Sequence, residues 1–417
     1  MKIFFATFGC KVNTCEDQYY LSLLIDKGFM EADSSDDADI VVINTCAVTK
    51  AAAKKSASYI SKVKNNKPHL KIVVTGCLAE DAGEKLKKYG ADVVVSNGSK
   101  DNLVEHIINL SDGFISADNG MFSGGALKYK TKSKTRAFFK IQDGCDAFCS
   151  YCIIPKLRGI PKSMPLEKAV SGFKSLLDLG YKEIVLTGIH IGLYGKDLGY
   201  SFTDLLQELL LIDRDFRIRL TSIEVNEIND RLLSLMKNNN KICRHLHIPL
   251  QSGSNNILKL MNRKYKREDY INTVKKARSL IDDITIGSDI IAGFPNESID
   301  DFNDTINCLD ISGTEFYHPF AYSKRHGTKA YEMDNQIDTK EKERRSTILR
   351  EKGKTACINK YKNSIGKTYR LLSEKGNKGH TDNYLLVHYK ENIEPNRFIN
   401  IEITEFKDNK LYGRLID

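Results

Sequence analysis

Three cysteines in one short run are the residues of this sequence best suited to chemistry. The run reads Cys145-Asp-Ala-Phe-Cys149-Ser-Tyr-Cys152, a C-x3-C-x2-C spacing. A structural zinc site or a closed iron-sulfur cluster takes four protein ligands, whereas this run offers three thiolates. A cubane of four irons on three cysteines leaves one iron open to a small molecule. The spacing therefore predicts reaction chemistry at a cluster, with a zinc loop or unrelated thiols as the alternative.

Three more cysteines, far apart in the sequence, stand at the ends of apolar runs. Cys10, Cys46 and Cys77 each follow a segment that reads as a buried strand. Ligands of open parallel α/β sheets gather at the carboxyl ends of the strands, so these thiols are expected to meet at one edge. The alternative is that they are inert core thiols, because cysteine is often fully buried.

The elements that position these cysteines suggest an α/β fold with three parts. Strands at 2–7, 40–44, 71–75 and 92–95 alternate with helical segments and predict an open parallel N-terminal domain over residues 1–112. A stretch rich in Gly, Ser and Lys predicts a linker at 113–130.

A second alternation of strands and helices predicts a partial (β/α)6 barrel over residues 131–362. Its strands are expected at 137–141, 183–187, 217–220, 245–248, 284–291 and 315–322, and its helices include 165–179, 204–212, 269–281 and 299–309. Residues 363–417 predict a small all-β barrel, with strands at 368–372, 384–388, 397–403 and 410–415.

The composition of the sequence restricts the cellular compartment and the partners that we expect for the protein. No run approaches the length of a membrane span, and the first residues do not form a secretory signal. Ten cysteines in 417 residues are too few for a disulfide scaffold, which favours a reducing cytoplasm. The net charge of +9 is concentrated in residues 113–162, 259–278 and 340–370. These stretches indicate either a polyanionic partner or simply solvated helices.

The triplet, with Tyr151 before its last cysteine, resembles the radical S-adenosylmethionine superfamily. The resemblance implies that Cys145, Cys149 and Cys152 hold a [4Fe-4S] cluster and that S-adenosyl-L-methionine binds its open iron. It implies cofactor contacts for residues that follow later strands: Tyr151, Thr187, Gly188, Ser222, Glu224, Gln251, Ser252, Ile290 and Gly293. The alternative interpretation for each of these residues is an ordinary turn or strand residue with no contact to a cofactor.

With Cys10, Cys46 and Cys77 the resemblance narrows to the methylthiotransferases. The motifs that carry it are Gly-Cys10-Lys-Val-Asn, Asn-Thr-Cys46-Ala-Val-Thr and Thr-Gly-Cys77-Leu-Ala. It implies a second [4Fe-4S] cluster on these three cysteines, where sulfur binds and is methylated. The electron donor would be a flavodoxin or ferredoxin, and the sulfur donor is unknown.

The residues beside the cysteines favour one branch of that family. Lys-Val-Asn after Cys10 and Gln-Asp before Gly144 resemble the branch that methylthiolates C2 of N6-threonylcarbamoyladenosine in the anticodon stem-loop of tRNA. Asp143 is thus a branch marker, and it is either a catalytic candidate or a solvated turn residue. The alternatives are the isopentenyladenosine branch, the ribosomal-protein aspartate branch, and a non-catalytic iron-sulfur protein that binds RNA.

Two features depart from the family pattern. The C-terminal barrel resembles the family's small RNA-binding domain, yet residues 363–417 hold nine basic and eight acidic residues and are nearly neutral. Phosphate contacts are therefore expected from the basic stretch before it, with Tyr384 or His380 contacting exposed bases. Cys15 is an unexpected thiol, either a spare ligand or sulfur carrier or, as we favour, a bystander.

Overall fold

The computed structural model describes residues 1–110 and 135–416. The chain forms two compact units, each of which gathers separate segments. The first consists of Met1–Gly180, Thr187–Ser201 and Ser323–Thr328, and the second consists of Tyr181–Leu186, Phe202–Tyr322 and Lys329–Asp417. The expected linker at 113–130 lies outside the described residues, and the domain boundaries at 112, 131 and 363 stay predictions.

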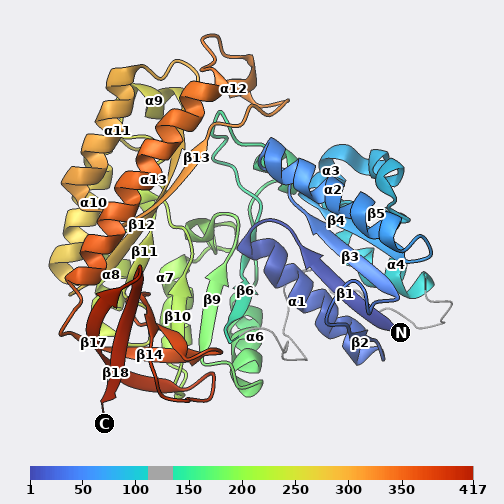
Figure 1. The fold of residues 1–417 in the computed structure, drawn as a ribbon, viewed down its shortest axis with the longest axis horizontal. Coiled ribbons are helices and arrows are strands. Elements are labelled where there is room, and N and C mark those ends of the chain that lie inside the picture. The colour runs from blue at the N-terminus through green and yellow to red at the C-terminus, as the bar shows by residue number, and fades with distance from the viewer. Residues whose placement is uncertain (111–134, 417) are drawn as a thin grey trace. The chain divides into compact units, whose positions relative to one another are not determined.

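A parallel sheet forms the centre of the first unit. Its order is β2-β1-β3-β4-β5, as Figure 1 shows. The strands are β1 (Lys2–Thr7), β2 (Met30–Glu31), β3 (Ile40–Thr45), β4 (Lys71–Gly76) and β5 (Val93–Val95). The four predicted strands are confirmed within one residue at each end. The two-residue β2 was not predicted, because it is too short to show a pattern.

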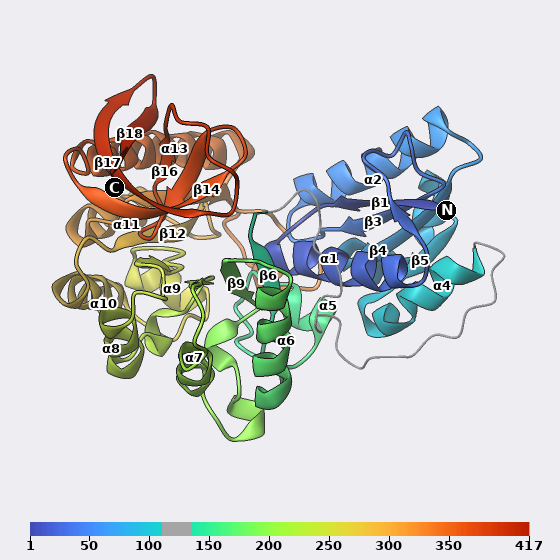
Figure 2. The same ribbon diagram turned by 90° about the horizontal axis from the view of Figure 1, so that it is seen from below.

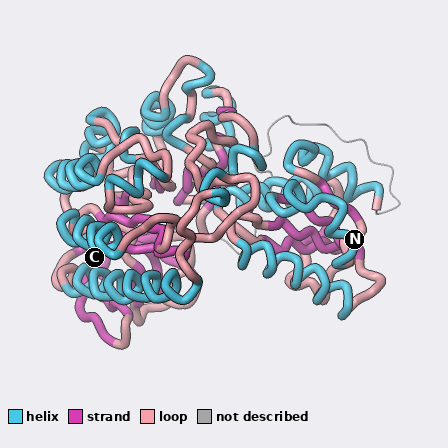
Figure 3. Tube along the Cα trace, turned by 90° about the horizontal axis from the view of Figure 1, so that it is seen from above, coloured by secondary structure: helices cyan, strands magenta, loops and turns pink. Residues whose placement is uncertain are grey.

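Helices cover both faces of this sheet, with the strands between them in Figures 2 and 3. Apolar residues of α1 (Lys11–Asp26) and α4 (Leu103–Asn109) pack on one face, and those of α2 (Lys50–Asn66) and α3 (Cys77–Ala82) pack on the other. Ile40, Val41, Val42 and Ile43 are fully buried, as expected for a central strand that is covered on both faces.

The first unit also holds the segment around the cysteine triplet. It contains β6 (Ala137–Lys140), the antiparallel pair β7 (Gln142–Asp143) and β8 (Lys162–Ser163), and the helices α5 (Ile154–Arg158) and α6 (Leu166–Asp178). Met164 N donates to Ile141 O at 2.8 Å, which ties β8 back to the end of β6. The triplet therefore lies in a loop between two short anchored strands.

The second unit continues the strand–helix alternation. Strand β9 (Glu183–Thr187) pairs in parallel with β10 (Arg217–Leu220), and β11 (His245–His247), β12 (Thr285–Ala292) and β13 (Phe316–Ala321) form another parallel sheet. The helices are α7 (Phe202–Leu210), α8 (Asp230–Asn238), α9 (Asn255–Leu260), α10 (Arg267–Leu280), α11 (Ile299–Ser312), α12 (Lys329–Glu332) and α13 (Thr339–Lys362). The predicted strands and helices of this region are confirmed, with ends that differ by up to three residues.

A closed β-barrel follows α13, as predicted. Its order is β14-β15-β16-β18-β17. The strands are β14 (Thr368–Glu374), β15 (Lys378–Thr381), β16 (Leu386–His388), β17 (Phe398–Lys407) and β18 (Lys410–Ile416).

The predicted strand 384–388 begins two residues too early, since β16 starts at Leu386. A turn after Thr381 separates β15 from β16, and Tyr384 in this turn has φ +71°. Buried Asn383 fixes the turn, because its Nδ2 donates to the carbonyl of Asp283 at 3.2 Å. The guanidinium of Arg219 lies 3.4 Å from the centre of the Tyr384 ring, so one face of this ring is already covered.

Asp283 joins the barrel to α13, and its replacement gives a test of stability against pH. Lys360 and Lys367 donate to its carboxylate at 2.8 and 3.1 Å, and Tyr369 also donates to it. Burial alone would raise the pKa of Asp283, but the hydrogen bonds from Lys360 and Tyr369 hold this pKa below its ordinary value. A lowered pKa in the folded state contributes stability above about pH 4, and this contribution disappears as pH falls through the folded value.

We expect Asp283→Asn to lower the free energy of unfolding by about 2 kcal/mol at pH 7, because hydrogen bonds to a charged group are lost. The difference from the unmodified protein should shrink below pH 4. Urea unfolding at pH 7 and at pH 3.5 or so measures both values. Asp282→Asn, at the exposed neighbouring position, is the control and should change neither. An equal loss of stability at both pH values would contradict the role of the carboxylate charge.

Candidate metal centres

Cys10, Cys46 and Cys77 all stand at the carboxyl edge of the first unit's sheet. Cys10 caps the N-terminus of α1, Cys46 directly follows β3, and Cys77 begins α3 directly after β4. The sheet register brings the strand ends together, since Thr45 of β3 is the partner of Gly76 in β4. The expectation that these strand ends share one edge is therefore met by the fold.

Gly76 shows how tightly the backbone is folded at this edge. Its φ is +94°, and a β-carbon at this position would collide with Asn44 and with the backbone of Thr45. Glycine avoids both the left-handed strain and the collision. The close approach places Cys77 directly beside the end of β3.

The three thiols are close enough to influence one another electrostatically. Burial is the main cause that raises the pKa of Cys10 and that of Cys46, and the neighbouring Cys77 raises both further. Arg158 acts in the opposite direction on Cys10 and lowers its pKa. A positive charge at this place favours the thiolate, which is the form that binds a metal.

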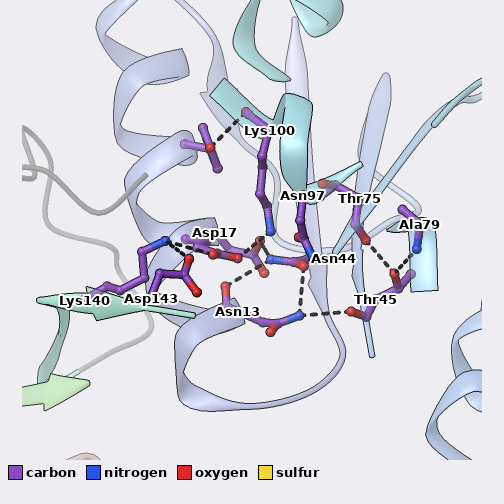
Figure 4. A network of polar contacts seen from close by, with 12 residues as sticks. Asn13, Asp17, Asn44, Thr45, Thr75, Ala79, Asn97, Lys100, Lys140 and Asp143 are labelled. Atoms are coloured by element: carbon purple, nitrogen blue, oxygen red, sulfur yellow. Dashed lines mark hydrogen bonds and ion pairs between the residues drawn. The ribbon is translucent and has the colours of Figure 1, made fainter. Parts of the chain in front are cut away.

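A buried polar network supports this edge, as Figure 4 shows. Asn13 lies three residues after Cys10, and its Nδ2 donates to Asn44 Oδ1 at 2.9 Å and to Thr45 O at 3.1 Å. Asn44 in turn donates to Asp17 Oδ1 at 2.7 Å. The network links α1 to β3, so it fixes the positions of Cys10 and Cys46 relative to each other.

A second network of buried charges continues from Asn13. Arg158 donates to Asn13 Oδ1 at 3.4 Å, to Glu16 Oε1 at 3.0 Å and to Asp143 Oδ1 at 3.1 Å. Lys140 donates to Glu16 and to Asp143 at 3.0 Å each, and Lys100 pairs with Glu16. Burial alone would raise the pKa of Glu16, but Arg158 and the two lysines hold it well below its usual range. Glu16 therefore stays ionised.

The loop with the triplet is shaped by hydrogen bonds at its first turn. Gly144 has φ +71°, and a β-carbon there would collide with the carbonyl of Ile160. Gln142 is buried, and its Nε2 donates to Asp143 O and Gly144 O at 2.8 Å each. Cys145 N donates to Gly159 O at 3.1 Å, and Cys152 N donates to Cys149 O at 2.9 Å. These contacts hold the three thiols in one compact loop.

The remaining cysteines lie apart from both sets. Cys15 is buried, its Sγ lies 3.1 Å from both Phe138 O and Lys140 N, and burial raises its pKa to about 12. This thiol is therefore neutral and engaged with the backbone. Cys243 and Cys308 are buried, and Cys357 lies in α13.

The expected cofactor contacts are distributed over both units. In the first unit, Tyr151 is half-buried within the triplet loop, Thr187 ends β9, and Gly188 packs against Gln142. In the second unit, Ser222 is exposed after β10, and Ile290 is fully buried in β12.

Four expected contacts of the second unit have local partners. Glu224 pairs with Arg263, and Ser252 is fully buried with its Oγ 3.3 Å from Thr305 Oγ1. Gln251 has φ +62° and joins β12 through a bridge to Ile290. Gly293 N donates to Glu297 Oε2 at 2.7 Å. These roles shape the loops that follow the strands.

Each of the two donor sets consists of three thiols. In residues 1–110 and 135–416, no group of three His, Cys, Asp or Glu side chains that could hold a single metal ion is found. Cysteine thiolates are the usual ligands of iron-sulfur clusters, so the chemistry of each set fits this type of group.

Several residues of these sites were not predicted from the sequence. His190 Nδ1 lies 3.4 Å from Cys145 Sγ, and the backbone N of His190 donates a hydrogen bond to Gln142 Oε1 at 2.8 Å. Glu16, Lys100 and Arg158 were also missed. The available signal was the placement of His190 three residues after a predicted strand, and that of Arg158 in a short helix after the triplet.

Family comparisons agree with this architecture. Residues 139–309 match the model of the radical SAM superfamily, and residues 2–96 match that of uncharacterized protein family UPF0004. The radical S-adenosylmethionine methyltransferase TsrM of Kitasatospora setae has a similar fold, with a TM-score of 0.56 and 13% identity over 77% of this chain and 74% of that one. The central fold and the triplet thus define a radical SAM protein, a class that uses a [4Fe-4S] cluster and S-adenosylmethionine.

Relatives that align with this chain over most of their length indicate which family of radical SAM proteins it belongs to. The threonylcarbamoyladenosine tRNA methylthiotransferase MtaB of Thermotoga maritima is 37% identical over 92% of this chain and 89% of its own. The tRNA-2-methylthio-N(6)-dimethylallyladenosine synthase of Endomicrobium trichonymphae is 34% identical over the whole of both chains. The chain belongs to the radical SAM tRNA methylthiotransferase family.

No helix in the described part of the chain is both long enough and apolar enough to cross a membrane.

Proposed function

We propose that this protein methylthiolates C2 of N6-threonylcarbamoyladenosine next to the anticodon of tRNA, with two [4Fe-4S] clusters. The observation that carries the proposal is the presence of two sets of three cysteines in the first unit. Cys15, the nearest additional thiol to Cys10 in the sequence, is engaged with the backbone, which supports an open iron at the cluster of Cys10, Cys46 and Cys77.

The chain's own residues have defined roles in this reaction. Cys145, Cys149 and Cys152 hold one cluster, and Cys10, Cys46 and Cys77 hold the other. Gln142 and Gly144 shape the triplet loop, while Asn13 and Arg158 support Cys10. When bound, the clusters and S-adenosylmethionine supply the radical and sulfur chemistry that acid and base side chains do not provide for an aromatic C–H bond.

The expected cofactor contacts are part of the proposal. Tyr151, Thr187 and Gly188 of the first unit are assigned to S-adenosylmethionine, together with five residues of the second unit: Ser222, Glu224, Gln251, Ile290 and Gly293. Ser252 is assigned to the same cofactor, and its Oγ lies 3.3 Å from Thr305 Oγ1. Electrons are proposed to come from a flavodoxin or ferredoxin in the cytoplasm, and no sulfur donor is assigned.

The threonylcarbamoyl substrate is favoured by the names of relatives at 35–37% identity, including that of Thermotoga maritima. Lys11, Val12 and Asp143 point to the same branch. The isopentenyladenosine substrate is the second candidate, because a relative of that name aligns over the full length of both chains.

Nucleoside analysis of tRNA from a deletion strain tests the choice of substrate. We expect the methylthio derivative of N6-threonylcarbamoyladenosine to disappear and the methylthio derivative of isopentenyladenosine to persist. A plasmid copy of the gene should restore the lost nucleoside, and a Cys149→Ala copy should not. Loss of the isopentenyl derivative instead would assign the second candidate substrate.

A further inference from the structure

Two histidines and a carboxylate lie together on neighbouring strands of the second unit. His247 is on β11, Asp289 on β12 and His318 on β13, and Asp289 is the direct partner of His318 in the register of the parallel sheet. His247 Nε2 lies 3.1 Å from Asp289 Oδ2, and the centres of the His247 and His318 rings are 5.2 Å apart. These three residues are called the histidine row below, and none of them has a role in the proposed function.

The row lies on the face of the sheet that is turned away from α13. Side chains alternate between the two faces of a strand. Tyr317 of β13 faces α13, which lies against β12 and β13 in Figure 1, because a β-carbon on Gly353 would lie 2.8 Å from it. On the other face His318 is exposed, and Phe320, two residues further along β13, is 50% exposed. Branched apolar side chains normally fill the inner face of a (β/α) barrel, so exposed His and Phe mark a surface that a ligand can reach.

Gly287 leaves room for the histidine row. It is the register partner of His247, and a β-carbon on it would lie 3.0 Å from His247 Nδ1. A side chain at this position would push the imidazole away from Asp289. With glycine there, His247 gives the Asp289 carboxylate a partner, and His318 is the exposed imidazole of the row.

The row also adjoins residues of the second unit that are assigned to S-adenosylmethionine. Gln251 N donates to Asp289 O at 2.9 Å, and Ser222 pairs with His247 in an isolated β-bridge. Both residues follow strands, and ligands of parallel α/β folds bind at the carboxyl ends of the strands. A substrate that meets the cofactor at this end of the sheet would therefore reach the row.

The chemistry of the row suits one of the two candidate substrates. A threonylcarbamoyl group carries a carboxylate, a hydroxyl and a urea, whereas an isopentenyl group is a hydrocarbon without hydrogen-bonding atoms. Imidazole has an N–H donor in either protonation state. A hydrocarbon placed on the row would remove water from its polar groups without replacing their hydrogen bonds, which costs free energy.

We propose that His318 is a specificity residue, which donates a hydrogen bond to the carboxylate of the threonylcarbamoyl group while the adenine ring stacks on Phe320. The inference rests on the proposed function and names the side chain that selects its substrate. Residues two apart on a strand are about 7 Å apart on one face, so a base on Phe320 can extend its N6 group to His318. Exposed aromatic rings are common stacking surfaces for unpaired bases of RNA.

The test compares two synthetic anticodon stem-loops, one with N6-threonylcarbamoyladenosine and one with its threonine methyl ester, which has no charged carboxylate. At low RNA concentration the reconstituted protein should methylthiolate the acid at least about tenfold faster than the ester, because a hydrogen bond to a charged group is weakened. His318→Phe keeps a ring but has no donor, and it should bring this ratio close to one. His318→Gln keeps a donor and should retain part of the preference.

Binding gives the same comparison without turnover. Fluorescence anisotropy of labelled stem-loops should show a higher Kd for the acid in His318→Phe and a similar Kd for the ester. His106→Phe is the matched control, because His106 is an exposed histidine on α4 of the first unit. It should keep the ratio and both Kd values. The iron content of each protein shows that all variants are equally loaded.

The outcomes separate this inference from the proposed function. Equal use of acid and ester by the unmodified protein, or an unchanged preference in His318→Phe, would refute the role of His318 and leave the proposed function standing. The same loss of preference in His106→Phe would refute it too. If the unmodified protein acts on neither RNA but methylthiolates a stem-loop with isopentenyladenosine, the proposed substrate is wrong and this inference falls with it.

Discussion

Cys149→Ala is expected to reduce the formation of 5′-deoxyadenosine from S-adenosylmethionine to background. Cys149 is the middle thiol of a loop that supplies only three ligands, so its loss leaves a cubane with two. The iron content of the reconstituted protein should fall from about eight to about four per chain, because the second set of cysteines is untouched. Anaerobic iron analysis and chromatography of the reaction after reduction measure both values.

The control for this variant is Cys357→Ala. Cys357 lies in α13 of the second unit, away from both cysteine sets in the sequence, and it should leave iron content and cofactor cleavage unchanged. If Cys149→Ala still cleaved S-adenosylmethionine, the cysteine triplet would not be the site of the radical chemistry.

Cys10→Ala is expected to separate the two halves of the reaction. The variant should still cleave S-adenosylmethionine, because the triplet is intact, but methylthiolated tRNA should fall to background. Among the described residues, Cys10 at the N-terminus of α1, Cys46 and Cys77 are the thiols that follow strands at this edge of the sheet, so we expect no other thiol to replace Cys10. Mass analysis of the tRNA nucleosides, together with the yield of 5′-deoxyadenosine, shows whether cofactor cleavage continues while methylthiolation is lost.

Cys15→Ala provides a demanding control, since this thiol is only five residues away on the same helix. Its sulfur contacts Phe138 O and Lys140 N, so we expect about eight irons and product formation close to normal. Loss of four irons in Cys15→Ala but not in Cys10→Ala would exchange the roles of the two thiols and refute this assignment.

Most strands could be predicted because their residues combine a high propensity for β-strands with burial in the core. Ile40 to Ile43 are β-branched and lie in a sheet covered on both faces, so an unbroken apolar run marks the strand. The turn at Tyr384 escaped prediction for the opposite reason. Its left-handed backbone is stabilised by contacts to Asp283 and Arg219, which are distant in sequence.

The cysteines could be predicted as site residues, but their supporting charges could not. Asn13, Glu16 and Asp17 are buried on α1 beside apolar residues such as Leu21 and Leu24, so this helix shows no clean polar face. A carboxylate in a helix is usually exposed, and only the fold reveals that Glu16 meets Lys100 and Arg158. Ion pairs between residues that are far apart in the sequence produce no local sequence pattern, so they could not be predicted.

The different sequence spans of the two thiol sets have a consequence for assembly. Cys145, Cys149 and Cys152 fall within eight residues, so closing the chain around iron there costs little entropy even before the surroundings fold. Cys10, Cys46 and Cys77 come together only after β1, β3 and β4 have paired in parallel, which requires long-range contacts to form first. Under the proposed function, metallation of the sheet edge is therefore expected to follow folding, whereas the loop is expected to bind its iron early.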